Sequence, residues 1–250
     1  MMSLTETSLW DAVKKQYVFK LQSYANFFVS LVIVQLVALL FSAGGMAGTS
    51  GIGWNNILVE VKLYSGTGIF IFTVLCTLAN SVILTLPFYR NIDFSFVGSR
   101  LSGNMANIGF LVTAGLFGGI TATLGSILLR NIHYYTGGGG EILKSFFMIT
   151  PGELVTGMAV AVLYLILFSA AGYFAGLVVQ LHRSLLVLLP ALIVGLIFYE
   201  AANEQIRIFS RLIEFFVFER SPFHFSLKII LIASLLWIGA ILLSNRKEVR

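Results

Sequence analysis

The charged and aromatic side chains of residues 86–101 are the ones whose types and spacing could do chemistry. Three ionisable residues fall here between two uncharged runs: Arg90, Asp93 and Arg100. The same stretch holds Pro87 and four aromatic residues, Phe88, Tyr89, Phe94 and Phe96. Arginine and aspartate make charge-assisted hydrogen bonds to a partner, and phenylalanine fills apolar grooves on one. The pattern therefore favours binding of another protein over catalysis.

Motifs for catalysis or nucleotide binding are absent from the sequence. There is no glycine-rich loop ending in Lys-Ser or Lys-Thr, no HExxH motif, and no serine nucleophile followed by a histidine in a later helix. Residues 48–53 have glycines at roughly the spacing of a phosphate loop, but they predict a plain loop. His133 has no second ligand at metal spacing. We expect no enzyme activity, cofactor or metal on this chain.

The composition is that of a membrane protein. Hydrophobic residues make up 58% and charged residues 11% of the chain, and the mean hydropathy is +0.92. A soluble domain carries about 25% charged residues, so these few charges could not cover a water-facing globule. The formal charge of +5 is not read as nucleic-acid binding, because in a membrane protein the sidedness of positive charge carries the information.

Six runs are long and apolar enough to cross a bilayer, which takes about 20 residues. They are residues 25–46, 66–88, 101–129, 151–181, 184–202 and 226–243. The sequence therefore predicts an all-α polytopic protein with one transmembrane domain over residues 1–250. The interiors of these runs contain no Asp, Glu, Lys, Arg or His, which argues against a proton-driven transporter.

Two further helices are predicted outside the spans. In residues 8–24, one helical face holds Trp10, Val13, Tyr17, Leu21 and Tyr24, while Asp11, Lys14, Lys15 and Gln16 lie largely elsewhere. This pattern suits a helix in the membrane interface, although it would also suit a plain leader to the first span. Residues 203–220 alternate apolar and charged positions at helical spacing, which predicts an amphipathic helix between spans five and six.

Small and polar residues mark the faces that the spans should bury. Gly115 and Gly119 are four residues apart, as are Gly172 and Gly176, and this spacing lets helix backbones approach closely. Along the second span, Thr73, Thr77 and Asn80 share one face. Polar groups at membrane depth need partners, so this face should meet another helix or line a substrate path, and packing is the favoured interpretation.

The distribution of Lys and Arg predicts which side each loop lies on. Six spans place nine of these residues on the side of the N-terminus and seven on the other. The positive-inside rule then makes both termini and residues 86–101 cytoplasmic, with the amphipathic helix outside.

The order of these elements resembles the membrane subunit of type-2 ABC exporters. In that family an interfacial helix precedes the first span, a Leu-Pro-x-x-Arg-like segment opens the loop between spans two and three, and short external helices lie between spans five and six. Here residues 8–24, Leu86-Pro87-Phe88-Tyr89-Arg90 and residues 203–220 stand at the matching places. The resemblance implies a homodimer or heterodimer of membrane subunits in the bacterial cytoplasmic membrane.

The resemblance also implies a separate ATPase chain, which holds ATP and Mg and docks on a coupling segment within residues 86–101. The coupling residues expected there are Pro87, Tyr89, Arg90, Asp93, Phe94, Phe96 and Arg100. The alternative for this loop is a solvated turn with aromatic anchors and cytoplasmic arginines.

The expected function is outward transport of a hydrophobic or amphipathic substrate, such as a peptide, a lipid or a drug. The alternative is a non-transporting membrane protein with an immunity, scaffold or assembly role. An intramembrane enzyme is the third and weakest hypothesis, because catalytic residues are missing at membrane depth. The expected partners are the bilayer, the ATPase and a second permease chain, and no nucleic acid.

Overall fold

The computed structural model describes residues 8–43, 49–54, 57–62, 66–89, 99–136, 150–180, 185–202, 211, 215–216 and 221–246. Within these ranges the helices are α1 (Leu9–Ser23), α2 (Ala25–Ala43), α3 (Thr67–Leu84), α5 (Arg100–Thr136), α7 (Pro151–Val179), α8 (Leu185–Ala202) and α10 (Pro222–Arg246). Two strands, β1 (Thr49–Trp54) and β2 (Ile57–Lys62), lie between α2 and α3.

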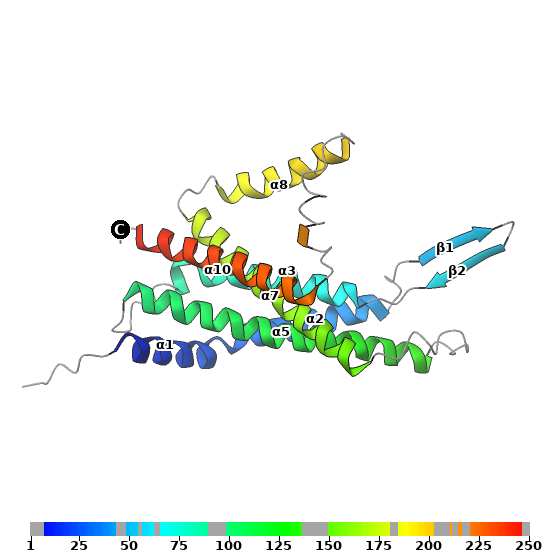
Figure 1. Cartoon of the computed structure of the whole chain (residues 1–250), viewed down its shortest axis with the longest axis horizontal. Helices are drawn as coiled ribbons and strands as arrows, with labels where there is room; N and C mark the ends of the chain where they lie inside the picture. The colour runs from blue at the N-terminus through cyan, green and yellow to red at the C-terminus, as the bar shows by residue number, and fades with distance from the viewer. Residues whose placement is uncertain are drawn as a thin grey trace, which may run out of the picture.

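In the described part of the chain, five helices are long and apolar enough to cross a bilayer: α2, α3, α5, α7 and α10. This confirms the predicted helical, membrane-protein character. The fifth predicted span corresponds to α8, which has 18 residues and lies apart from the other helices in Figure 1. A sixth crossing, made by α8, stays a prediction.

The five long helices form a bundle around α7, which packs against α3, α5 and α10. In Figure 1 they run along the long axis of the molecule. The C-terminus, α1 and the start of α5 lie at one end of this bundle, and the strands extend from the other. We call the first end the terminal end. The helix α1 continues the line of α2 and packs along the N-terminal part of α5.

Local sequence signals explain where several helices begin and end. Ser8 caps α1 and accepts a hydrogen bond from Asp11 N at 3.2 Å. The helix α7 begins at Pro151 after a capping box in which Thr150 and Glu153 bond each other's backbone N–H groups at 3.3 and 3.2 Å. A capping box and a first-turn proline both fix a helix start, and the sequence predicted this start correctly.

The helical conformation is interrupted between α1 and α2 at Tyr24, whose φ and ψ are −104° and 31°. The Tyr24 N–H still donates to Lys20 O at 2.9 Å, and Phe27 N donates to Tyr24 O at 3.0 Å. The backbone N–H and C=O groups of Tyr24 therefore both stay hydrogen-bonded where the two helices meet. We call this connection the α1–α2 joint.

A β-hairpin replaces the plain loop that the glycines of residues 48–53 predicted. The strands β1 and β2 are antiparallel, with Thr49 opposite Lys62 and Trp54 opposite Ile57. The signal that could have shown this is the alternation of Ile57, Val59 and Val61, β-branched residues at a period of two. The loop prediction for residues 48–53 was therefore wrong for residues 49–53, which belong to β1.

Helix lengths also differ from the predicted spans. The third span was expected to end at residue 129, but α5 runs from Arg100 to Thr136, which is 37 residues. At about 1.5 Å per residue this helix is some 55 Å long, well beyond a hydrocarbon core of about 30 Å. The second span was expected to reach residue 88, but α3 ends at Leu84 and Thr85 forms a turn.

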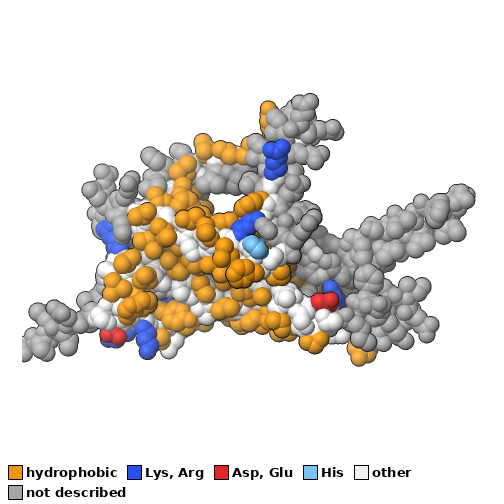
Figure 2. All heavy atoms as spheres, in the orientation of Figure 1, with side chains coloured by type: hydrophobic (Ala, Val, Ile, Leu, Met, Phe, Trp, Pro, Cys, Tyr) orange, Lys and Arg blue, Asp and Glu red, His pale blue; other side chains and the backbone are white. Residues whose placement is uncertain are grey.

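The outer surface of the bundle is apolar. On α2, for example, Ile33, Leu36 and Leu40 are exposed by 54%, 55% and 70%. Figure 2 shows hydrophobic side chains over most of the described face of the bundle. A contiguous apolar surface of this kind marks contact with lipid or with another protein, which agrees with membrane-spanning helices.

Candidate functional site

The predicted coupling segment is described at its two ends. Residues 87–89 form a helical turn after α3, and Arg100 is the first residue of α5. The remaining predicted coupling residues, Arg90, Asp93, Phe94 and Phe96, lie outside the described residues. The described parts of the segment are therefore a helical turn at residues 87–89 and the start of α5.

Pro87 and Phe88 point outward, and Phe88 is 70% exposed. Tyr89 is partly buried and contacts the joint between α1 and α2. Its ring centroid lies 5.1 Å from that of Tyr24 and 5.8 Å from that of Phe27, both edge to face. Edge-to-face pairs contribute about 0.5–1.5 kcal/mol each beyond area burial. Tyr89 thus joins the coupling segment to the α1–α2 joint.

A second contact ties the start of the segment to α7. The C-cap residue of that helix, Gln180, donates from Nε2 to Thr85 O and to Thr85 Oγ1, the latter at 3.0 Å. The end of α5 nearest the segment is fixed by Ser99, whose Oγ accepts from Ser102 N at 3.2 Å. The segment therefore begins and ends on structured elements of the bundle.

A buried polar cluster lies close to this joint, and sequence reasoning missed it. Lys20 of α1 is 1% exposed, and its Nζ donates to Asn107 Oδ1 of α5. Asn107 Nδ2 donates to Tyr173 Oη at 3.1 Å, and Tyr173 Oη donates to Asn104 Oδ1 at 2.8 Å. These four residues, Lys20, Asn104, Asn107 and Tyr173, form the Lys20 cluster, which links α1, α5 and α7.

The cluster is costly to bury, so its retention asks for an explanation. An ammonium group removed from water needs hydrogen-bond partners, because its desolvation costs several kcal/mol. Among the described residues, Asn104 Nδ2 and the nearby Gln16 Oε1 have no hydrogen-bond partner. Buried polar atoms are rarely left in this state, so hydrogen bonds among the described residues offset only part of the desolvation cost of this cluster.

One sequence expectation is refined as a result. Gln16 was placed away from the apolar face of residues 8–24, and this residue is 3% exposed, so a polar side of the helix is packed against the bundle. The expectation that the span interiors hold no ionisable residue is unaffected, because Lys20 reaches the bundle from α1, outside the spans. The signal available in the sequence was the stripe Gln16, Lys20 and Tyr24, spaced by four, facing Asn104 and Asn107, spaced by three.

The residues predicted to line a substrate path make hydrogen bonds to other groups of the same chain. Thr73 and Thr77 are buried, and their hydroxyls donate to the carbonyls one turn earlier at 2.7 and 2.8 Å. Asn80 is partly buried and donates to Ser30 Oγ of α2 at 3.0 Å. These contacts favour the packing interpretation of this face.

The four predicted packing glycines all lie at helix contacts. A Cβ on Gly119 would come within 2.9 Å of Val162 Cα, and one on Gly115 within 3.2 Å of Ile166 Cγ1, where α5 meets α7. A Cβ on Gly172 would lie 2.7 Å from Leu78 O, and one on Gly176 2.5 Å from Thr85 Oγ1, where α7 meets α3. A methyl group fits poorly at each position.

The predicted amphipathic helix of residues 203–220 is described only at Arg211, Phe215 and Phe216, which are helical. Tyr164 Oη of α7 donates to Phe216 O at 2.7 Å. Lys228 Nζ of α10 donates to Phe215 O and lies 3.4 Å from the centroid of its ring. These contacts hold Phe215 and Phe216 against α7 and α10, and the rest of the predicted helix lies outside the described residues.

The fold and these contacts define a class: a helical protein with membrane-length helices and a joint at its terminal end. Comparisons with protein-family models, with curated proteins and with solved structures found no match to this chain. The functional argument therefore depends on the residues and contacts described above.

Proposed function

We propose that this chain is the membrane subunit of an ABC exporter whose ATPase is a separate chain. It would move a hydrophobic or amphipathic substrate, such as a peptide, a lipid or a drug, outward across a bacterial cytoplasmic membrane. The observation that carries the proposal is the position of Tyr89. It connects the coupling segment to the joint between α1 and α2, so a force applied to the segment reaches two helices at once.

The contacts suggest how such a force would spread. The ATPase would bind the outward-facing Pro87 and Phe88 together with Arg90, Asp93, Phe94, Phe96 and Arg100. Displacement of Tyr89 would move the α1–α2 joint, and the Lys20 cluster would pass that movement to α5 and α7. Packed helices move as rigid bodies in transitions of this type.

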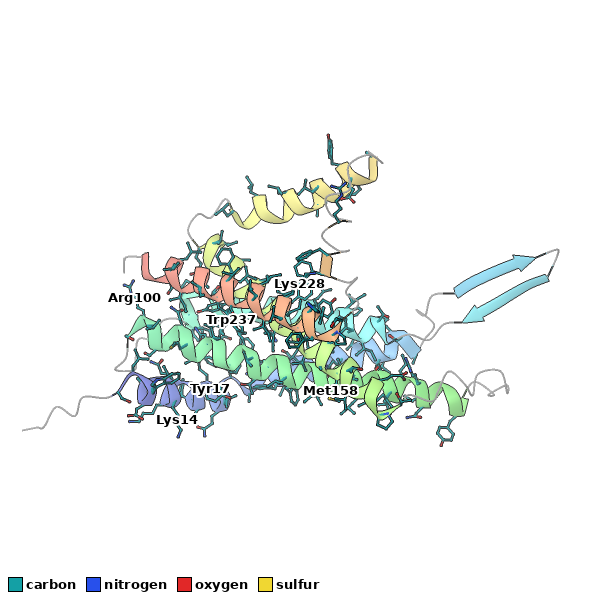
Figure 3. All side chains as sticks on the ribbon, in the orientation of Figure 1. Lys14, Tyr17, Arg100, Met158, Lys228 and Trp237 are labelled. Atoms are coloured by element: carbon teal, nitrogen blue, oxygen red, sulfur yellow. The ribbon has the colours of Figure 1, made fainter. Side chains whose placement is uncertain are left out.

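The proposal includes two permease chains and a sixth crossing by α8. An even number of crossings keeps both termini on one side of the membrane. This is supported by Figure 1, in which α1 and the end of α10 lie at the same end of the bundle. The start of α5, at Arg100, is at that end too (Figure 3). The proposed cytoplasmic side is therefore the terminal end, where the ATPase would dock.

The double substitution Arg90→Ala with Phe94→Ala tests the coupling role. We expect it to reduce co-purification of the ATPase, because it removes one charge-assisted contact and one apolar anchor from the proposed interface. The measurement is the amount of ATPase recovered with the tagged permease in detergent, together with stimulated ATP hydrolysis.

A matched control removes the same two residue types elsewhere. Arg211 and Phe223 are exposed on a different part of the chain, so Arg211→Ala with Phe223→Ala should leave the ATPase bound. Equal ATPase recovery and transport in both double variants would refute the coupling role of residues 86–101.

One observation favours the alternative, a non-transporting membrane protein with an immunity, scaffold or assembly role. Thr73, Thr77 and Asn80, the residues predicted to line a substrate path, are occupied by contacts within the chain. Under this alternative no ATPase would co-purify, and vesicles containing the protein would show no ATP-dependent transport.

A further inference from the structure

The face that α1 turns away from the bundle combines apolar and basic side chains. Trp10 is 72% exposed, and Leu9 and Val18 are each 42% exposed. Lys14 and Lys15 are also exposed. Four of these residues share one side of the helix at 3.6 residues per turn, and we call them the outer face of α1: Trp10, Lys14, Lys15 and Val18. Leu9 lies on the opposite side of the helix from Val18. In Figure 2, Lys and Arg side chains lie beside hydrophobic ones at this end of the molecule.

The side of α1 that packs against the bundle is mixed: Gln16 and Lys20 are 3% and 1% exposed, and Tyr24 is 6% exposed. Val13 on the same side is partly buried. Trp10 is the largest apolar side chain of α1 that this packing leaves uncovered, at 72% exposure. An exposed tryptophan beside lysines is typical of a helix at the headgroup level of a membrane.

Contacts with α5 fix the rotation of α1 about its axis. Tyr17 Oη and Thr113 Oγ1 share a hydrogen bond of 2.9 Å, and Lys20 donates to Asn107 nearly one turn further along. Bonds at two successive turns hold the helix in one orientation. The outer face is therefore a fixed surface, and not one that α1 could turn inward.

The charges on this face select among lipids. Two lysines, Lys14 and Lys15, stand against one aspartate, Asp11, which accepts a hydrogen bond from Ser8 Oγ at 2.7 Å. Tryptophan and lysine together are typical of the headgroup level of a membrane. Basic residues at that level attract anionic lipids, and each contributes about a fivefold gain in local affinity.

We propose that the outer face of α1 binds anionic lipid headgroups in the leaflet at the terminal end of the bundle. Trp10 and Val18 contact the upper acyl chains, and Lys14 and Lys15 bind the phosphate groups. This proposal goes beyond the exporter function and does not depend on it, since it concerns only the contact between α1 and lipid.

Tryptophan quenching tests the proposal directly. The chain has three tryptophans, so Trp54→Phe with Trp237→Phe leaves Trp10 as the only reporter. The protein is placed in phosphatidylcholine vesicles that contain phosphatidylglycerol, with bromine on the acyl chains of one lipid or the other. We expect brominated phosphatidylglycerol to quench Trp10 more strongly at equal mole fraction.

Lys14→Gln with Lys15→Gln should remove most of this preference, and so should high salt, which screens exposed charges. Arg130→Gln, near the other end of α5, is the matched control and should keep it. Equal quenching by both lipids, or an unchanged preference in the double lysine variant, would overturn the proposal. No quenching by either lipid would also overturn it, and would place water or protein against Trp10.

A second measurement uses no tryptophan substitution, so its result does not depend on how the tryptophan variants fold. Native mass spectrometry of the protein with all three tryptophans counts the phosphatidylglycerol molecules that remain bound. We expect fewer in the Lys14→Gln, Lys15→Gln variant than in the unsubstituted protein. Because neither readout involves an ATPase, failure of this proposal is distinguishable from failure of the exporter proposal.

Discussion

At the scale of single residues, Lys20 joins α1 to α5 at the terminal end of the bundle. Its ammonium group is buried where α1 meets α5 and is bonded to Asn107. An apolar residue of similar length would pack there without the desolvation cost, so the lysine is not explained by packing alone. Its bond to Asn107 orients the amide that in turn bonds Tyr173.

Lys20→Met tests the hydrogen-bonding role of this residue. Methionine keeps the length of the side chain but leaves Asn107 Oδ1 without its donor, so we expect a loss of about 1–3 kcal/mol in stability. Thermal unfolding in detergent measures the loss. The double variant Lys20→Met with Asn107→Leu should be more stable than Lys20→Met, because it removes the orphaned amide. A double variant less stable than Lys20→Met would contradict the claim that the unpaired Asn107 amide causes the loss of stability.

At the scale of elements, the helix contacts depend on glycines whose missing side chains let the backbones approach. The pair α5 and α7 meets at Gly115 and Gly119, and the pair α7 and α3 meets at Gly172 and Gly176. Because α7 takes part in both contacts, it lies at the centre of the bundle. A methyl group at either contact would separate two helices and disturb packing along their length.

Gly119→Ala should destabilise the protein by about 1–3 kcal/mol, the usual cost of overpacking. Its Cβ would lie 2.6 Å from Val162 Cγ2 and 2.9 Å from Val162 Cα, so the backbone of α7 would have to move. Gly157→Ala is the matched control, since nothing lies within 4 Å of a Cβ there. That control should gain about 0.5–1 kcal/mol from helix propensity. Similar unfolding temperatures for the two variants would contradict the packing account.

The sequence predicted most of the helices because apolar runs and caps are local signals. The start of α7 followed from Pro151 and Glu153, and the glycine contacts followed from a spacing of four. The hairpin was missed because the glycines of residues 48–53 outweighed the alternation of Ile57, Val59 and Val61. Lys20 was missed because its burial depends on Asn107, 87 positions away, and no local pattern reports that contact.

At the scale of the whole molecule, the terminal end gathers the features that matter for the proposed function. In Figures 1 and 3, α1 and the start of α5 lie at this end, and the hairpin lies at the other. Tyr89 contacts Tyr24 at the α1–α2 joint, and Lys20 of α1 bonds Asn107 in the N-terminal part of α5. A partner that pushes on residues 87–89 would act on the contacts of Tyr89 with the α1–α2 joint. The central claim is therefore that an ATPase binds at this end.

Site-specific photocrosslinking from Phe88 is the most direct test of that claim. This side chain is 70% exposed next to Tyr89, so a benzophenone amino acid in its place would touch a docked partner. The control places the same amino acid at Phe223, which is also 70% exposed but belongs to the start of α10. The account predicts a covalent adduct with a nucleotide-binding chain from position 88 and none from position 223. Crosslinking in whole cells that yields no such adduct from position 88 would contradict it.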